Sequence, residues 1–103
     1  MALPPRDHRI SLADAAAHTR RHREAKALPV TAGAFHADQV RALLAQPGCA
    51  LLRIYHGRDE QGAPTMILVG ADAEGDDLVT GTILEWDHPC PPFCSTGNAL
   101  TNG

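Results

Sequence analysis

The order of helical and strand patterns along the chain is the feature that most constrains its fold. Apolar side chains recur at helical spacing in residues 11–26 and 36–46, and strand patterns follow in residues 49–56, 65–70 and 78–86. Short polar loops join these strands, which favours antiparallel pairing. The order therefore predicts an α+β fold in which two N-terminal helices pack on one face of a three-stranded antiparallel meander.

Local signals support these elements. Ser11 can cap the first helix, with Asp14 three residues later in a variant capping box, and Pro47-Gly48 ends the second helix. The second strand is apolar on both faces, which predicts a central place in the sheet. Two helices and three strands make a thin core, so we expect the sheet to extend through a partner chain.

Length and composition indicate one small soluble domain. The chain has 103 residues, of which 44% are hydrophobic and 20% charged. We expect a flexible basic arm at residues 1–10, a single α+β domain at residues 11–87 and a Pro/Cys-containing tail at residues 88–103. No apolar run approaches the roughly 20 residues that span a membrane, and the first residues do not resemble a signal peptide. The expected location is the cytoplasm.

The charges are distributed unevenly. Residues 1–26 hold six Lys or Arg and three acids, whereas residues 59–103 hold eight acids and no Lys or Arg. One interpretation is a basic first helix that binds nucleic acid or an acidic protein through Arg20, Arg21, Arg23 and Lys26. The other is that the two ends attract each other, within the fold or across a homodimer.

Two further residues are candidates for an interaction site. Arg53 and Tyr55 alternate along the first predicted strand and therefore share one face, where they could bind an anion or a partner. The alternative is that they belong to the polar outer face of an antiparallel sheet.

The tail gathers the residues with the most reactive chemistry. His88, Cys90 and Cys94 are candidate zinc ligands, because zinc prefers thiolate and imidazole. The C-x3-C spacing differs from the C-x2-C of common structural zinc sites. Free thiols, a disulfide, a metal site and a catalytic thiol remain alternatives. Cys49 could also meet either tail cysteine in space.

The two prolines between the tail cysteines make local pairing conditional. An extended polyproline conformation would separate the Cα atoms of Cys90 and Cys94 by about 12 Å, whereas a disulfide needs about 7 Å or less. The pair can therefore form a bridge or a chelate only if an X-Pro bond is cis or the chain turns sharply.

The first helix offers a second candidate metal site. Asp14, His18 and His22 recur at intervals of four residues and share one helix face. A histidine pair at this interval is a metal-binding geometry. A simple surface pair of Asp14 with His18 is the alternative.

A set of short motifs carries a resemblance. Pro47-Gly48-Cys49, Arg53-Ile54-Tyr55, Leu68-Val69-Gly70-Ala71-Asp72 and Cys90-Pro91-Pro92-Phe93-Cys94 occur in this order. In this the chain resembles a group of small uncharacterised bacterial proteins with a PGC, RIY, LVGxD and CPPxC order. The resemblance implies a bacterial single-domain protein, and it brings no activity and no functional residue.

These observations lead to a ranked set of functional hypotheses. The sequence lacks a phosphate loop, a nucleophile elbow and an HExxH helix, so we expect a protein that is not an enzyme. The first hypothesis is a homo-oligomeric protein-interaction module. The alternatives are a metal or thiol-redox site built from Cys49, His88, Cys90 and Cys94, with zinc as the possible cofactor, and a nucleic-acid binder.

Overall fold

The computed structural model describes residues 2–103 and has a mixed α+β fold, as predicted. Its elements divide between two compact units, the first of residues 2–5 and 35–87 and the second of residues 6–34 and 88–103. The helices are α1 (Leu12–Ala25), α2 (Ala37–Leu44) and α3 (Ala99–Asn102). The strands are β1 (Ala32–Ala34), β2 (Leu51–Arg58), β3 (Pro64–Ala71), β4 (Ile83–Leu84) and β5 (His88–Cys90).

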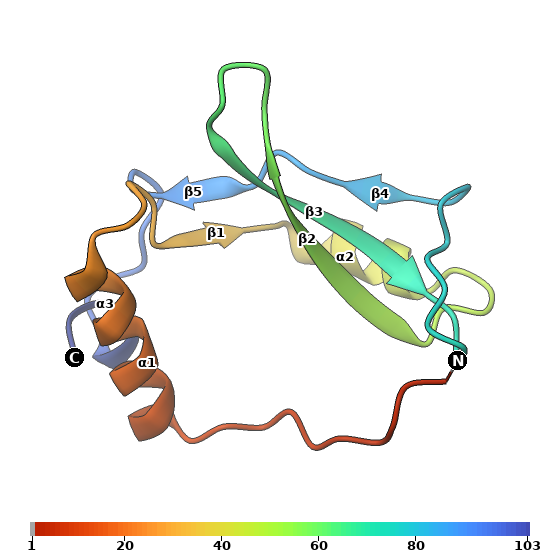
Figure 1. Ribbon diagram of the computed structural model, residues 1–103, viewed down its shortest axis with the longest axis horizontal. Coiled ribbons are helices and arrows are strands. Elements are labelled where there is room, and N and C mark those ends of the chain that lie inside the picture. The colour runs from red at the N-terminus through yellow and green to blue at the C-terminus, as the bar shows by residue number, and fades with distance from the viewer. Residues whose placement is uncertain (1) are drawn as a thin grey trace. The chain divides into compact units, whose positions relative to one another are not determined.

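The first unit contains the predicted three-stranded antiparallel sheet (Figure 1). The strand order is β2-β3-β4, so the apolar β3 is central, as its sequence predicts. The register of β2 with β3 runs from Leu51 opposite Ala71 to Arg58 opposite Pro64. Strand β4 adds two pairs, one of which joins Val69 to Ile83.

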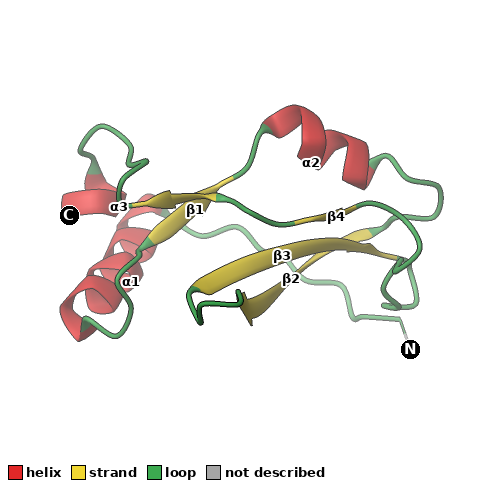
Figure 2. Ribbon diagram, turned by 90° about the horizontal axis from the view of Figure 1, so that it is seen from above, coloured by secondary structure: helices red, strands yellow, loops and turns green. Residues whose placement is uncertain are grey.

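Helix α2 lies along β3 and β4 (Figure 2) and contributes Leu43 to a core whose other buried hydrophobic residues, Leu68, Val69 and Ala71, belong to β3. Leu43 projects from α2 and is the one large side chain among residues 2–103 that is fully buried. Gln46, just past the helix, donates to the Leu43 carbonyl at 2.7 Å and accepts from the Thr82 amide at 2.8 Å. These two hydrogen bonds connect the end of α2 to the segment that leads into β4.

The third strand is shorter than predicted. The sequence indicates a strand over residues 78–86, but β4 covers Ile83–Leu84. The Gly81 amide donates to the Leu78 carbonyl and forms a turn there, and Trp86 has a left-handed φ of 65° that ends the extended backbone. A Cβ at Gly81 would lie 2.0 Å from Gln46 Oε1, so a larger residue there would displace the Gln46 side chain from its hydrogen bond with Thr82.

The second unit joins α1 to the segment predicted to be a tail. Strand β1 pairs antiparallel with β5, and α1 contacts α3 (Figure 1). Ser11 caps α1 as predicted, because its side chain accepts from the Asp14 amide at 3.0 Å. The expectation that α1 packs on the three-stranded sheet is not confirmed. Within residues 2–103, no helix has the length and apolar character that a membrane span requires.

Candidate thiol–disulfide site

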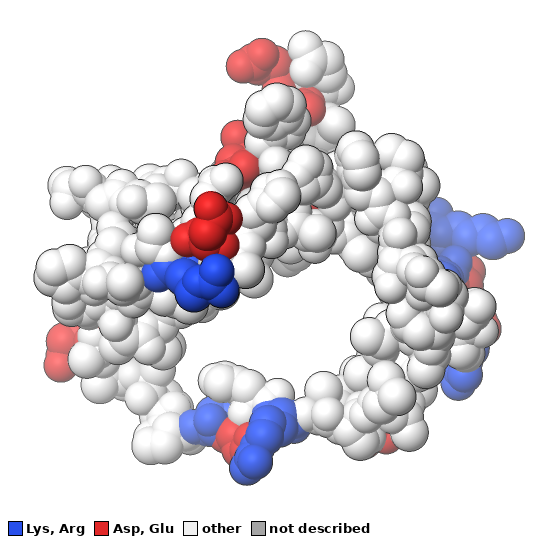
Figure 3. Space-filling view, turned by 180° about the vertical axis from the view of Figure 1, so that it is seen from behind, with Lys and Arg blue, Asp and Glu red and all other residues white. Residues whose placement is uncertain are grey.

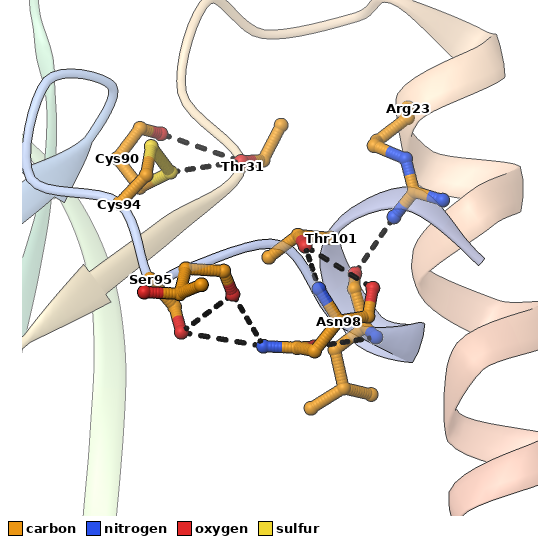
Figure 4. Close-up of a disulfide and its surroundings, with 9 residues drawn as sticks. Arg23, Thr31, Cys90, Cys94, Ser95, Asn98 and Thr101 are labelled. Atoms are coloured by element: carbon orange, nitrogen blue, oxygen red, sulfur yellow. Dashed lines mark hydrogen bonds between the residues drawn. A yellow bond between two sulfur atoms is a disulfide. The ribbon is translucent and has the colours of Figure 1, made fainter.

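Cys90 and Cys94 form a disulfide in the second unit (Figure 4). Their Cα atoms lie 4.8 Å apart. The sequence allows this pairing only if an X-Pro bond is cis or the chain turns sharply, and the Cys90-Pro91 and Pro91-Pro92 peptide bonds are both cis. The pairing leaves Cys49 as a free cysteine of the first unit.

Strand pairing fixes the position of Cys90. Cys90 ends β5 opposite Ala32 of β1, and the neighbouring Thr31 amide donates to the Cys90 carbonyl at 2.8 Å. The Thr31 hydroxyl lies 3.4 Å from the same carbonyl and 3.7 Å from Cys90 Sγ, within the range for donation to each. Cys90 is buried, with 9% of its surface exposed.

Cys94 differs from Cys90 in its access to solvent. It lies in an exposed turn after the two prolines. The Phe93 amide donates to the Pro89 carbonyl at 2.8 Å, and the Phe93 ring meets the His88 ring edge-on with a centroid distance of 5.1 Å. An external thiolate therefore has a more open approach to Cys94 than to Cys90.

The segment after Cys94 is fixed by Asn98 and Arg23 (Figure 4). Asn98 caps α3, because its side-chain oxygen accepts from the backbone amide of Leu100 at 2.8 Å. The backbone amide of Asn98 donates to the Thr101 hydroxyl, also at 2.8 Å. The Arg23 guanidinium of α1 donates to the backbone oxygens of Leu100 at 2.7 Å and of Gly103 at 3.0 Å. These contacts tie the segment to α1.

A cavity of about 760 Å³ lies beside the disulfide within the second unit. It is open to solvent on one side, and residues of α1, of β1 and of the segment from Cys90 to Thr101 line it. Its polar lining includes His18, His22 and Arg23, and Phe93 and Leu100 belong to its apolar lining. This volume is within the range of small-molecule sites.

The structure gives the predicted metal ligands a different arrangement. Cys90 and Cys94 are adjacent to each other, but in the disulfide neither carries the thiolate that zinc binds. Across residues 2–103, no group of three or more His, Cys, Asp or Glu side chains is placed to hold a metal ion. Zinc binding by Cys90, Cys94 and His88 in the reduced protein stays a prediction.

Arg53 and Tyr55 share one face as predicted, and both bind Asp77 within the first unit. Arg53 donates to an Asp77 carboxylate oxygen at 2.6 Å and to the Gly75 carbonyl at 2.8 Å. Tyr55 donates to the other Asp77 oxygen. The two residues thus fasten the turn after β3 to β2.

This triad perturbs the titration of its members. The hydrogen bond from Tyr55 lowers the pKa of Asp77 below its ordinary value, partial burial opposes this, and the Arg53 hydrogen bond and charge lower it further. The hydrogen bond to Asp77 is also the main cause that raises the pKa of Tyr55 and of Arg53.

The predicted basic residues of α1 and its C-cap Lys26 differ in exposure. Arg20, Arg21 and Lys26 are exposed, whereas Arg23 is half-buried against α3. On the face drawn in Figure 3, blue Lys or Arg atoms lie beside red Asp or Glu atoms in several places. A nucleic-acid interface through these residues stays a prediction.

Sequence reasoning missed two residues of the disulfide site. Asn98 with Thr101 three residues later follows the capping-box pattern, so the short α3 had a readable signal. Thr31 had none, because it meets Cys90 across 59 positions of sequence.

Comparison with known proteins adds no family to this description. The chain matches no family model, no curated protein and no solved structure. The function must therefore be inferred from the geometry of the chain itself.

Proposed function

We propose that the protein is a thiol–disulfide exchange module whose redox pair is Cys90 and Cys94. The observation that carries the proposal is a short-range disulfide with one exposed and one buried sulfur-bearing residue at the wall of a cavity. Exposed disulfides are the ones that exchange readily, because the attacking thiolate must reach one sulfur in line with the bond.

The proposed reaction takes two electrons from a protein dithiol. A partner thiolate attacks Cys94 Sγ, the Cys90–Cys94 bond breaks, and its electron pair passes to Cys90 Sγ, which then takes a proton. The second partner thiolate attacks the partner sulfur of this mixed disulfide and releases Cys94 as a thiolate, which is also protonated. The products are two cysteine thiols and one partner disulfide.

The surroundings of Cys90 support its role as the leaving sulfur. The Thr31 hydroxyl lies at hydrogen-bonding distance from Cys90 Sγ and can donate to a thiolate formed there. Hydrogen-bond donors near a sulfur favour its thiolate form.

Trapping experiments test the assignment of the two sulfurs. In a Cys49→Ser background, Cys90→Ser leaves the exposed Cys94, which is first converted to a mixed disulfide with thionitrobenzoate. The single thiolate of a dithiol protein that has lost its resolving cysteine then attacks Cys94 Sγ, displaces thionitrobenzoate and forms a protein–protein mixed disulfide. Intact mass spectrometry should find this adduct in high yield for Cys90→Ser and in low yield for Cys94→Ser. Equal yields, or none from either variant, would contradict the proposed order of attack.

A second candidate function is self-association through the edge of the three-stranded sheet. Strand β2 is eight residues long and occupies an edge of the sheet, with Leu52 exposed by 40% and Ile54 by 46%. An unpaired strand edge is a template for another strand. Two copies that pair their β2 strands about a two-fold axis bring the same apolar side chains together, which makes a second copy the fitting occupant.

Analytical ultracentrifugation tests this candidate. Ile54→Lys places a charge on the edge and should shift a dimer to monomer. Val79→Lys is the matched control, because Val79 is also apolar, is 68% exposed and lies outside β2. A monomeric wild-type protein at high concentration, or a dimer that survives Ile54→Lys, would count against the β2 interface.

A further inference from the structure

We infer that the cavity beside the disulfide binds a low-molecular-weight thiol that bears carboxylates, and that this ligand reduces Cys94–Cys90. The inference rests on the proposed exchange function and names the small-molecule reductant of that same site. Three properties of the cavity carry it: its size, the charge of its lining and the presence of the disulfide in its wall.

The lining of the cavity favours an anion. Among the described residues that form it, the ionisable side chains are Arg23, His18 and His22, and no Asp or Glu is present. Arginine and imidazole N–H groups are suited to binding carboxylates. Asp14 lies one turn before His18 on α1 and does not belong to the lining.

The remaining lining indicates a small organic ligand of mixed polarity. Ala32, Pro91, Phe93 and Leu100 supply apolar surface, and Thr31, Ser95 and Thr101 supply hydroxyl groups. A volume of about 760 Å³ accommodates a peptide-sized molecule. A bound thiol would then lie next to the exposed Cys94.

Two ligand molecules balance the reaction. The first ligand thiolate attacks Cys94 Sγ and forms a mixed disulfide, while Cys90 leaves with the electron pair and is protonated. A second ligand thiolate attacks the ligand sulfur of this adduct and releases Cys94, which is protonated in turn. The ligand is oxidised to its own disulfide, and the protein gains two thiols.

The binding step can be tested without any redox chemistry. The probe is S-methylglutathione, which carries two carboxylates and no free thiol, titrated calorimetrically into the disulfide-bonded protein. We expect saturable binding that weakens at least fivefold in the double variant His18→Gln/His22→Gln. His56→Gln is the matched control, because His56 lies on β2 outside the cavity, and it should bind as the wild type does. Arg23 is left intact because it anchors α3.

Reduction rates distinguish the ligand inference from the exchange function on which it rests. The double histidine variant should be reduced more slowly by glutathione and at the wild-type rate by the uncharged dithiothreitol. Absence of S-methylglutathione binding together with normal reduction by dithiothreitol would overturn the ligand inference and leave the exchange function standing. Saturable binding by a disulfide that neither reagent reduces would overturn the exchange function and the reductant role together.

Discussion

Single residues decide how the two sulfurs of the disulfide differ. Thr31 places a hydroxyl near Cys90 Sγ, and the strand pair β1–β5 holds Cys90 in a buried position. Cys94 lies in an exposed turn. This asymmetry is what assigns attack to Cys94 and departure to Cys90.

Replacing Thr31 by Val tests that asymmetry. The substitution keeps the shape of the side chain and removes the hydroxyl, so the leaving thiolate loses a donor. A hydrogen bond of about 1 kcal/mol corresponds to roughly fivefold in rate, and we expect reduction by dithiothreitol to slow by about this factor. Stopped-flow thiol detection measures it. An unchanged rate would remove Thr31 from the mechanism.

Asp77 gives a second prediction at this scale. Because the folded protein lowers the pKa of Asp77, the carboxylate stabilises the fold above its ordinary pKa of 3.8, and this contribution is lost as the pH falls through the lowered value. Asp77→Asn should therefore lower the melting temperature at neutral pH, and the difference from the wild type should shrink in acid. Asp76→Asn is the control, because Asp76 is the exposed neighbour of Asp77 in the sequence. A difference independent of pH would contradict the account.

At the scale of elements, long regular segments were predictable and short ones were not. The periodicity of α1, α2, β2 and β3 is local to the sequence, and each forms near its predicted boundaries. Strands β1 and β5 have three residues each and exist because they pair with each other across the chain. The disulfide was left open for a local reason, because the sequence does not fix the conformation of the two prolines between Cys90 and Cys94.

Helix α2 contributes one fully buried side chain to the core of the first unit. Leu43→Ala removes a fully buried leucine, which costs about 2–5 kcal/mol in well-packed cores. Urea unfolding followed by circular dichroism measures this loss. Leu44→Ala, at a neighbour that is 43% exposed, should cost much less. Equal losses would mean that Leu43 does not anchor α2 on the sheet.

At the scale of the whole molecule, the chain forms two units that are stabilised in different ways. The first unit has a sheet and a helix around Leu43, Leu68 and Val69. In the second unit, the buried apolar residues among those described are Ala16 and Cys90, so the disulfide, the β1–β5 pair and the Arg23 contacts must supply much of its order. Its redox state is therefore expected to control the order of that unit alone.

Hydrogen exchange tests this division. Reduction should raise amide exchange in β1, β5 and α3, where few apolar contacts replace the lost covalent link. Exchange in the β2–β3 pair should stay unchanged. Mass spectrometry of peptides from both units reads the two responses in one experiment, with Cys49→Ser as the background. Faster exchange in both units would contradict a local switch.

The most direct test of the central claim is the equilibrium reduction potential of the Cys90–Cys94 pair. The Cys49→Ser protein is equilibrated in dithiol–disulfide buffers, quenched with an alkylating reagent and measured by intact mass. Structural disulfides of secreted proteins fall below about −300 mV. A reversible two-electron transition above that value is the predicted result. A midpoint below it would identify the bond as a structural link and contradict the proposed function.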